Sequence, residues 1–178
     1  MKLGAKIFGA LSSVLVLYLI LGLLLPGTWE AQVETFLSSP PAAVFPFLNR
    51  MDQWVLWNQL PDSGVETEGP AEGVGAGLRW DDESYGEGSV RIVVSETNAR
   101  VEYEVQVEGG ALEIRGVLSL SPEGGGVRLL WSERGDFGWN PLMGYAAKGM
   151  GASQEEAMRS NLKTLQGLVD EVAPGEAG

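Results

Sequence analysis

The sequence predicts an α+β protein, in which an antiparallel sheet packs against a long C-terminal helix and one transmembrane helix precedes them. Three observations lead to this prediction. An apolar run near the N-terminus is long enough to cross a bilayer. The middle of the chain alternates apolar and polar residues, which is the period of β-strands. Apolar residues near the C-terminus recur at helical spacing.

The predicted membrane helix covers residues 7–25, which contain eight leucines and no charged residue. At about 1.5 Å per residue, a helix of this length roughly spans the hydrocarbon core. Lys2 and Lys6 precede it, and Glu30 is the first acidic residue. Because positive flanks stay inside, we predict a single-pass protein of the cytoplasmic membrane, with its N-terminus inside and its domain outside, periplasmic or extracellular. Trp29 is placed as an interfacial aromatic residue would be.

A cleaved signal peptide is the alternative reading of the same segment. Such peptides usually have an apolar core of about 7–15 residues and a cleavage site of small residues. The run here is longer, and Leu-Leu-Leu-Pro-Gly-Thr-Trp offers no such site. The sequence therefore favours a retained anchor: a cytoplasmic stub and signal anchor over residues 1–28, then a domain over residues 29–173 and a flexible tail over residues 174–178.

Composition limits the chemistry of the domain. The chain has no His and no Cys, which excludes disulfides, Ser-His-Asp triads and the usual zinc sites. Two of its 12 basic residues precede Glu30, and all 24 acidic residues lie from Glu30 onward. The outer part therefore has 10 basic and 24 acidic residues, which gives a net charge of −14. Phosphate backbones need clustered cations, so we expect no nucleic acid partner. We also expect no metal and no cofactor.

The first half of the domain reads as a strand, two short helices and a loop. Residues 28–37 are rich in β-branched and aromatic residues, which favours a strand. Ser39-Pro40-Pro41 is typical of a helix start, and Pro46 keeps that helix short or kinks it. A second short helix follows over residues 51–57. The glycine-rich and acidic stretch over residues 61–77 reads as a loop with one short strand near Val65.

Period-two alternation then predicts a meander of about six strands. Gly109-Gly110 is expected to form a two-residue hairpin turn, and residues 121–126 another turn. The last strand ends near Asp136. The alternating apolar positions are Leu78 and Trp80; Val90, Ile92 and Val94; Val101, Tyr103, Val105 and Val107; Leu112, Ile114, Leu118 and Leu120; Val127, Leu129 and Trp131. One apolar face implies a sheet covered on one side.

The covering element is predicted to be the C-terminal helix. Asn140-Pro141 resembles an N-cap followed by the first helical residue. Helical spacing then continues to Val172. The glycines at 144, 149 and 151 weaken the first half, so a break or kink is expected there and a steadier helix over residues 153–172.

This order of elements resembles the START-like, or Bet v 1-like, superfamily, often labelled SRPBCC. It is most similar to the polyketide cyclase/dehydrase and lipid-transport-like group. The segments that carry the resemblance are the opening strand with residues 39–45, then residues 54–58, 75–80, 121–131 and 161–165. The resemblance covers roughly residues 29 to 172. It implies a helix-grip fold, with a cavity between sheet and helix that often holds an apolar molecule, but it implies no particular reaction.

Large aromatic and methionine side chains are the candidates for lining that cavity, because they are apolar and methionine adapts to varied shapes. Ordinary core filling is the alternative for each of them. The candidates are Trp54, Trp57, Trp80, Tyr103, Trp131, Met143, Met150 and Met158.

Two carboxylates are the candidate acid or base groups. Asp82 continues the phase of Leu78 and Trp80, and Glu133 continues the phase of Trp131, so both are expected on the concave face. With Tyr103 they could transfer protons if buried. The alternative is that both lie solvated at the rim or pair with Arg79 or Arg134.

The sequence thus predicts a membrane-anchored START-like domain that binds an apolar small molecule or lipid and performs no catalysis. It contacts the membrane through residues 7–25. One alternative is an enzyme of the cyclase or dehydratase kind that uses the cavity carboxylates. Another is a protein-interaction module with a filled core, whose acidic surface meets a basic partner.

Overall fold

The computed structural model describes residues 2–61, 63–84 and 86–172. The predicted tail over residues 174–178 lies outside this part of the chain. In chain order the elements are α1 (Lys2–Leu24), β1 (Thr28–Leu37), α2 (Pro41–Asn49), α3 (Met51–Trp57), β2 (Val65–Glu68), β3 (Gly77–Asp82), β4 (Gly86–Glu96), β5 (Arg100–Val107), η1 (Glu108–Gly110), β6 (Leu112–Glu123), β7 (Gly126–Asp136) and α4 (Met143–Val172).

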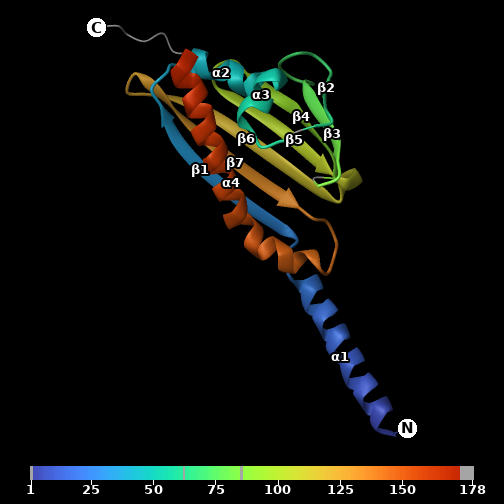
Figure 1. Ribbon diagram of the computed structural model, residues 1–178. Coiled ribbons are helices and arrows are strands. Elements are labelled where there is room, and N and C mark those ends of the chain that lie inside the picture. Colours follow the sequence, from blue (N-terminus) through green and yellow to red (C-terminus); the bar gives the residue numbers. More distant parts are fainter. Residues whose placement is uncertain (1, 62, 85, 173–178) are drawn as a thin grey trace.

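Seven strands form one antiparallel sheet in the order β1-β7-β6-β5-β4-β3-β2. The sheet curves, and α2, α3 and α4 lie on its concave side (Figure 1). α1 extends away from the end of the sheet where β1 begins and β7 ends (Figure 1). The predicted antiparallel sheet with a long C-terminal helix and one N-terminal apolar helix is therefore confirmed.

The core lies between the concave face and the three helices. Each strand turns alternate side chains toward the helices, as the pleat requires. Each large apolar side chain buried in this way contributes roughly 1.5–3 kcal/mol. The buried inward side chains of the sheet include Trp29, Ala31, Val33, Leu37, Leu78, Trp80, Val90, Ile92, Val101, Tyr103, Leu118, Leu120, Val127, Leu129 and Trp131.

α4 is one unbroken helix whose first turns are set at an angle to the rest (Figure 1). The predicted break or kink is therefore present, as a kink. The side chain of Asn140 accepts a hydrogen bond from the amide of Leu142 at 3.0 Å, as expected of a cap. Gly144 and Gly151 allow close packing, since a Cβ on Gly151 would lie 2.5 Å from the carbonyl oxygen of Glu30.

One predicted turn is wrong, and the other, over residues 121–126, is present but tighter than predicted. The connection between β5 and β6 has four residues and contains η1, so Gly109-Gly110 is not a two-residue turn. The two-residue hairpin is instead Gly124-Gly125, between β6 and β7, where both residues have positive φ (56° and 89°). Such turns match the twist of the flanking strands. Similarly, a bulge between Ile92 and Val94 moves Val94 out of phase with Ile92.

Trp29 is not the interfacial residue that its place in the sequence suggested. It is only 5% exposed, and its ring covers Gly135 on β7. The reason is the phase of β1, which turns Trp29, Ala31 and Val33 inward together. The preceding segment, Lys6–Leu24, is long and apolar enough to cross a membrane, a property that membrane anchors share with signal sequences.

Candidate functional site

Four of the predicted ligand-binding residues form one aromatic cluster beneath the sheet. Trp54 and Trp57 come from α3, Tyr103 from β5 and Trp131 from β7. The rings of Trp54 and Tyr103 meet edge to face with centroids 4.8 Å apart, and those of Trp57 and Trp131 do so at 5.6 Å. α2 supplies carbonyl oxygens to both α3 indoles, at 2.7 Å for Trp54 and 2.9 Å for Trp57. These bonds hold α3 against α2, while the two ring contacts pack α3 on the sheet.

A buried polar group sits beside this cluster. The hydroxyl of Tyr103 donates to Glu133 Oε1, and Gln154 Nε2 donates to Glu133 Oε2 at 2.6 Å. Trp131 Nε1 in turn donates to the Tyr103 hydroxyl at 2.6 Å. Glu133 is only 7% exposed, so its predicted inward phase is confirmed. It does not pair with Arg134, which points outward and contacts Glu30 at 3.2 Å.

Burial dominates the electrostatics of this group. It raises the pKa of the Glu133 carboxyl above its ordinary value, although hydrogen bonds from Tyr103 and Gln154 favour the ionised form. Burial, and then the neighbouring Glu133 charge, raise the pKa of Tyr103 well above its usual range. The cluster therefore holds a carboxyl with an increased proton affinity, which can accept or donate a hydrogen bond in an apolar setting.

Asp82 does not join Glu133. It ends β3, opposite Gly86, and three strands separate it from β7 in the sheet. Its side chain accepts a hydrogen bond from the amide of Ser84 at 2.8 Å and is only half-buried, because the strand ends there in a turn. The structure thus brings Glu133 and Tyr103 together and leaves Asp82 at the rim.

The remaining predicted residues have different surroundings. Met158 is fully buried beneath the sheet, and Met150 is half-buried against the core. Met143 is the first residue of α4, outside the core cluster. Trp80 is 7% exposed, its ring covers Gly88, and its buried indole nitrogen has no hydrogen-bond partner in the described part of the chain.

Apolar side chains at one end of the concave face are only partly covered. Val105 and Ile114 face each other across β5 and β6, and Val107 pairs with Gly88, which Trp80 covers. Val105, Val107, Ile114 and Met150 are all half-buried. This set, the concave apolar end, adjoins the Tyr103–Glu133 pair, because Gly116 lies opposite both of those residues.

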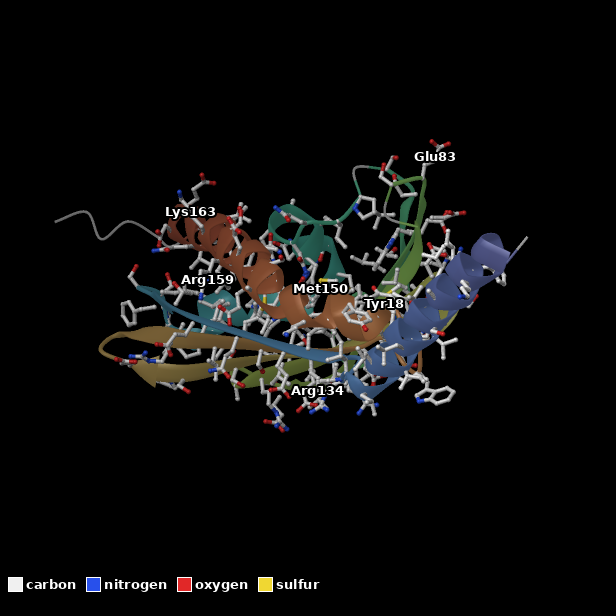
Figure 2. The ribbon with its side chains drawn as sticks, turned by 90° about the horizontal axis from the view of Figure 1, so that it is seen from below. Tyr18, Glu83, Arg134, Met150, Arg159 and Lys163 are labelled. Carbon is white, nitrogen blue, oxygen red and sulfur yellow. The ribbon has the colours of Figure 1, made fainter. Side chains whose placement is uncertain are left out.

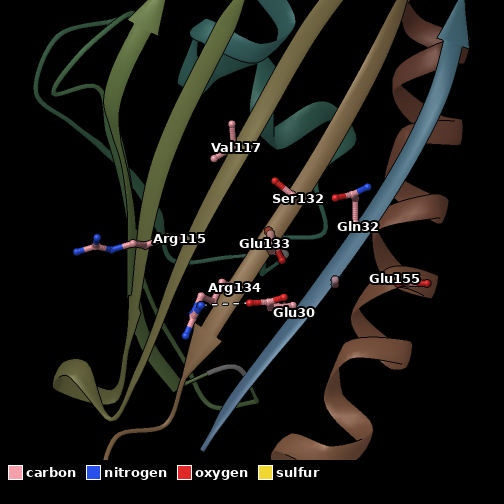
Figure 3. Close-up of a pocket in the computed structure, with 9 residues that line it drawn as sticks. Glu30, Gln32, Arg115, Val117, Ser132, Glu133, Arg134 and Glu155 are labelled. Atoms are coloured by element: carbon pink, nitrogen blue, oxygen red, sulfur yellow. Dashed lines mark hydrogen bonds and ion pairs between the residues drawn. The ribbon is translucent and has the colours of Figure 1, made fainter.

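A separate hollow of about 460 Å³ lies along β1, β7 and β6, mostly on their outer face, and Glu155 of α4 also lines it beyond the β1 edge. Its rim carries the exposed ion pair between Glu30 and Arg134 (Figure 3). Glu133 borders it, but the side chain of Glu133 contacts Tyr103 and Gln154 on the concave side. The lining residues are Glu30, Ala31, Gln32, Arg115, Val117, Ser132, Glu133, Arg134 and Glu155. This hollow is not the predicted interior cavity.

Comparison with known proteins decides the family. A family model described as polyketide cyclase/dehydrase and lipid transport matches residues 28–170. The chain belongs to this family. The expected resemblance is confirmed over almost the whole of the predicted domain.

Solved structures show the fold of this family member. TTHA0849 from Thermus thermophilus is similar with a TM-score of 0.62 at 18% identity, covering 82% of this chain and 99% of the other. Ara h 8.0201 is similar with a TM-score of 0.59 at 18% identity, covering 81% of this chain and 99% of the other. An uncharacterised protein from Rhizobium leguminosarum is similar with a TM-score of 0.58 at 17% identity, covering 81% of this chain and 95% of the other. No curated protein sequence matches the chain. The fold is therefore Bet v 1-like.

Sequence reasoning missed one member of the polar group, Gln154. A signal was present, because Gln154 lies four residues from both Met150 and Met158, on the helix face that meets the sheet. It also missed Gly116, whose lack of a side chain leaves room for the Tyr103 ring. Among the residues that the structure describes, no group of carboxylates is arranged to hold a metal ion.

Proposed function

We propose that this family member is a membrane-anchored binding protein for an apolar small molecule or lipid, held on the concave side between the sheet and α4. The observation that carries the proposal is the concave apolar end. Val105, Val107, Ile114 and Met150 are apolar and half-buried, whereas most other apolar side chains on the concave face are buried. Covering them with an apolar ligand would remove further apolar surface from water.

Two polar groups give such a ligand a preferred orientation. The indole N–H of Trp80 is buried and lacks a partner in the described residues, so a ligand oxygen would satisfy it. The carboxyl of Glu133 lies near the same end and can bind a hydroxyl or amide group. An apolar molecule with one or two oxygen-containing groups fits this arrangement.

The contact between α1 and α4 supports a retained anchor over residues 1–28. Gly22 is buried against Pro141, and Gly144 packs against Leu25. A segment that is removed after export has no need to fit the mature domain. We therefore propose the signal anchor, with the domain over residues 29–173 outside the cytoplasmic membrane.

Native mass spectrometry of the full-length protein in mild detergent tests the binding function. We expect a reproducible bound species that organic extraction releases and identifies as an apolar molecule or lipid. Consistent recovery of ligand-free protein from its native membrane would contradict the proposal.

A matched pair of variants localises the bound molecule. Ile114→Gln places a polar group on the concave apolar end, whereas Val117→Gln places one on the outer face of the same strand. An unpaired amide in an apolar site costs about 1–3 kcal/mol, so affinity should fall about fivefold to 150-fold for the first variant. The second variant should bind as the natural chain does.

The close Tyr103–Glu133 contact also favours a second candidate, an enzyme that transfers protons in a cyclisation or dehydration. In that case Glu133→Gln, which keeps the shape of the side chain, should trap a substrate. The molecule extracted from the variant would then differ from that in the natural protein, being heavier by one water for a dehydration, or of equal mass but different chromatographic retention for a cyclisation. If both proteins hold the same molecule, binding alone is supported.

A further inference from the structure

The last turns of α1 and the start of α4 lie side by side. The rings of Tyr18 and Tyr145 stack in parallel with centroids 4.5 Å apart, and Tyr145 donates a hydrogen bond to the carbonyl oxygen of Tyr18 at 2.8 Å. Viewed from below, Tyr18 lies against the beginning of α4 (Figure 2). Gly22 leaves room for the Pro141 carbonyl, and Gly144 packs against Leu25.

These contacts set the depth of α4 relative to a membrane. Residues 7–25 span about 28 Å as a helix, nearly the ~30 Å of a hydrocarbon core, so the whole run is needed to cross it. Tyr18 lies six residues before the end of α1, or about 9 Å below it. If α1 spans the bilayer, the first turn of α4 must lie beside it at the level of the lipids.

The composition of this region suits that position. No charged residue occurs between Asp136 and Lys148. Within this stretch Trp139 is 87% exposed and Leu142 is 51% exposed, although both are large and apolar. Trp is the residue most typical of the membrane–water interface. The segment thus exposes two large apolar side chains close to the helix that would lie in lipid.

Its backbone is also adapted to an environment poor in water, where every unsatisfied amide is costly. The amide of Phe137 donates to the carbonyl of Gly27 at 3.0 Å. The amide of Gly138 donates to the Asp136 carboxylate at 2.8 Å, and those of Leu142 and Met143 donate to Asn140. These bonds satisfy four backbone amides in the irregular part of the segment.

We propose that residues 137–147 form a second membrane-contacting segment, seated in the lipid interface beside α1. The partner is the outer leaflet of the membrane that α1 spans, and the inference rests on the proposed retention of α1 as an anchor. Two attachments fix the orientation of the domain. Phe137, the first residue of the segment, packs against the core, and Ile114 lies opposite Gly135, two residues before it. The concave apolar end therefore adjoins the lipid, from which an apolar ligand can enter.

Single cysteines test this placement cleanly, because the chain contains none of its own. Trp139→Cys and Leu142→Cys carry a nitroxide spin label in the full-length protein, reconstituted in phospholipid nanodiscs. Val14→Cys, in the exposed face of α1, is the lipid reference. Glu123→Cys is the water reference, since it lies at the far end of β6 and β7 from Asp136. Both test positions are exposed, so the substitutions leave the core intact.

We expect labels at 139 and 142 to collide mainly with oxygen and to lose most of their collisions with a water-soluble nickel chelate, as at Val14. Labels at 139 and 142 that behave like the one at Glu123, while Val14 stays in lipid, would overturn this inference alone. A water-exposed label at Val14, or loss of α1 by mass, would overturn the anchor as well. Ligand content, measured separately by native mass spectrometry, decides the binding function.

Discussion

Glu133 is inside the protein because β7 keeps a strict alternation from Val127 to Gly135. Its inward neighbours on β7 are apolar. The carboxylate accepts hydrogen bonds from two neutral side chains, Tyr103 and Gln154. No cation among the described residues pairs with it. A buried carboxyl of this kind costs stability, and proteins commonly retain one for binding or chemistry.

The pH dependence of stability should report this residue. Its folded-state pKa is raised, so the folded protein binds the proton more tightly than the unfolded chain does. Stability should therefore fall as pH rises from the ordinary glutamate value through the folded-state pKa, by about 1.4 kcal/mol per unit of difference. Glu133→Gln should remove this decline.

The measurement is chemical unfolding of the full-length protein in detergent across a pH series. Glu113→Gln, on the exposed face of β6, controls for the loss of one negative charge. An identical pH slope in the Glu133→Gln variant and the natural protein would show that the carboxyl is not responsible.

Gly116 gives a second prediction at this scale. A Cβ there would overlap the ring and hydroxyl of Tyr103, so Gly116→Ala must displace the ring from Glu133. Overpacking of this kind costs about 1–3 kcal/mol. Gly149→Ala, at an open position in α4, should instead be neutral or stabilising by up to about 1 kcal/mol. Thermal unfolding distinguishes them, and equal effects would contradict the packing argument.

At the scale of elements, the sequence was informative where one period holds over a whole segment. Alternation predicted the inward side chains of β5 and β7, including Tyr103 and Glu133. It failed where a local feature resets the phase, as at the bulge after Ile92 and in the turn that leaves Asp82 at the rim. Such features depend on contacts with neighbouring strands, which a single segment does not encode.

Contacts between elements that are far apart in the sequence could not be predicted either. Gln154 meets Glu133 only because α4 crosses the sheet at a particular angle. The glycines of α4 indicated a weak helix, but two of them serve close approaches, Gly144 to α1 and Gly151 to β1. The contact between α1 and the start of α4, where Tyr145 stacks on Tyr18, could not be predicted from either segment alone.

The packing of α1 on α4 yields a prediction about elements. A Leu side chain at Gly22 would collide with Pro141 and Tyr145, whereas the same change at Gly9 meets no atom within 4 Å. Gly22→Leu should therefore separate α1 from the first turns of α4 and leave the sheet unchanged. Amide hydrogen exchange should become faster over residues 143–148 in that variant and not in Gly9→Leu. Equal protection in both would mean that this contact contributes little.

For the whole molecule, charge and apolar surface are divided in a way that suits a tethered domain. The chain from Glu30 onward has a net charge of −14, whereas the flank of α1 carries Lys2 and Lys6. An anionic bilayer surface repels such a domain, so electrostatic attraction cannot hold it at the membrane. The proposed attachment would therefore depend on apolar contacts, which concentrated salt does not weaken.

This division leads to a prediction about topology, because a basic flank stays in the cytoplasm. In intact cells a membrane-impermeant maleimide should label Lys163→Cys, on the exposed side of α4, and should label Lys6→Cys only after the membrane is opened. Both variants should remain with the membrane through washes in concentrated salt and alkaline carbonate. Labelling of position 6 but not 163 in intact cells would reverse the orientation, and release of the protein by carbonate would show that α1 does not span the bilayer.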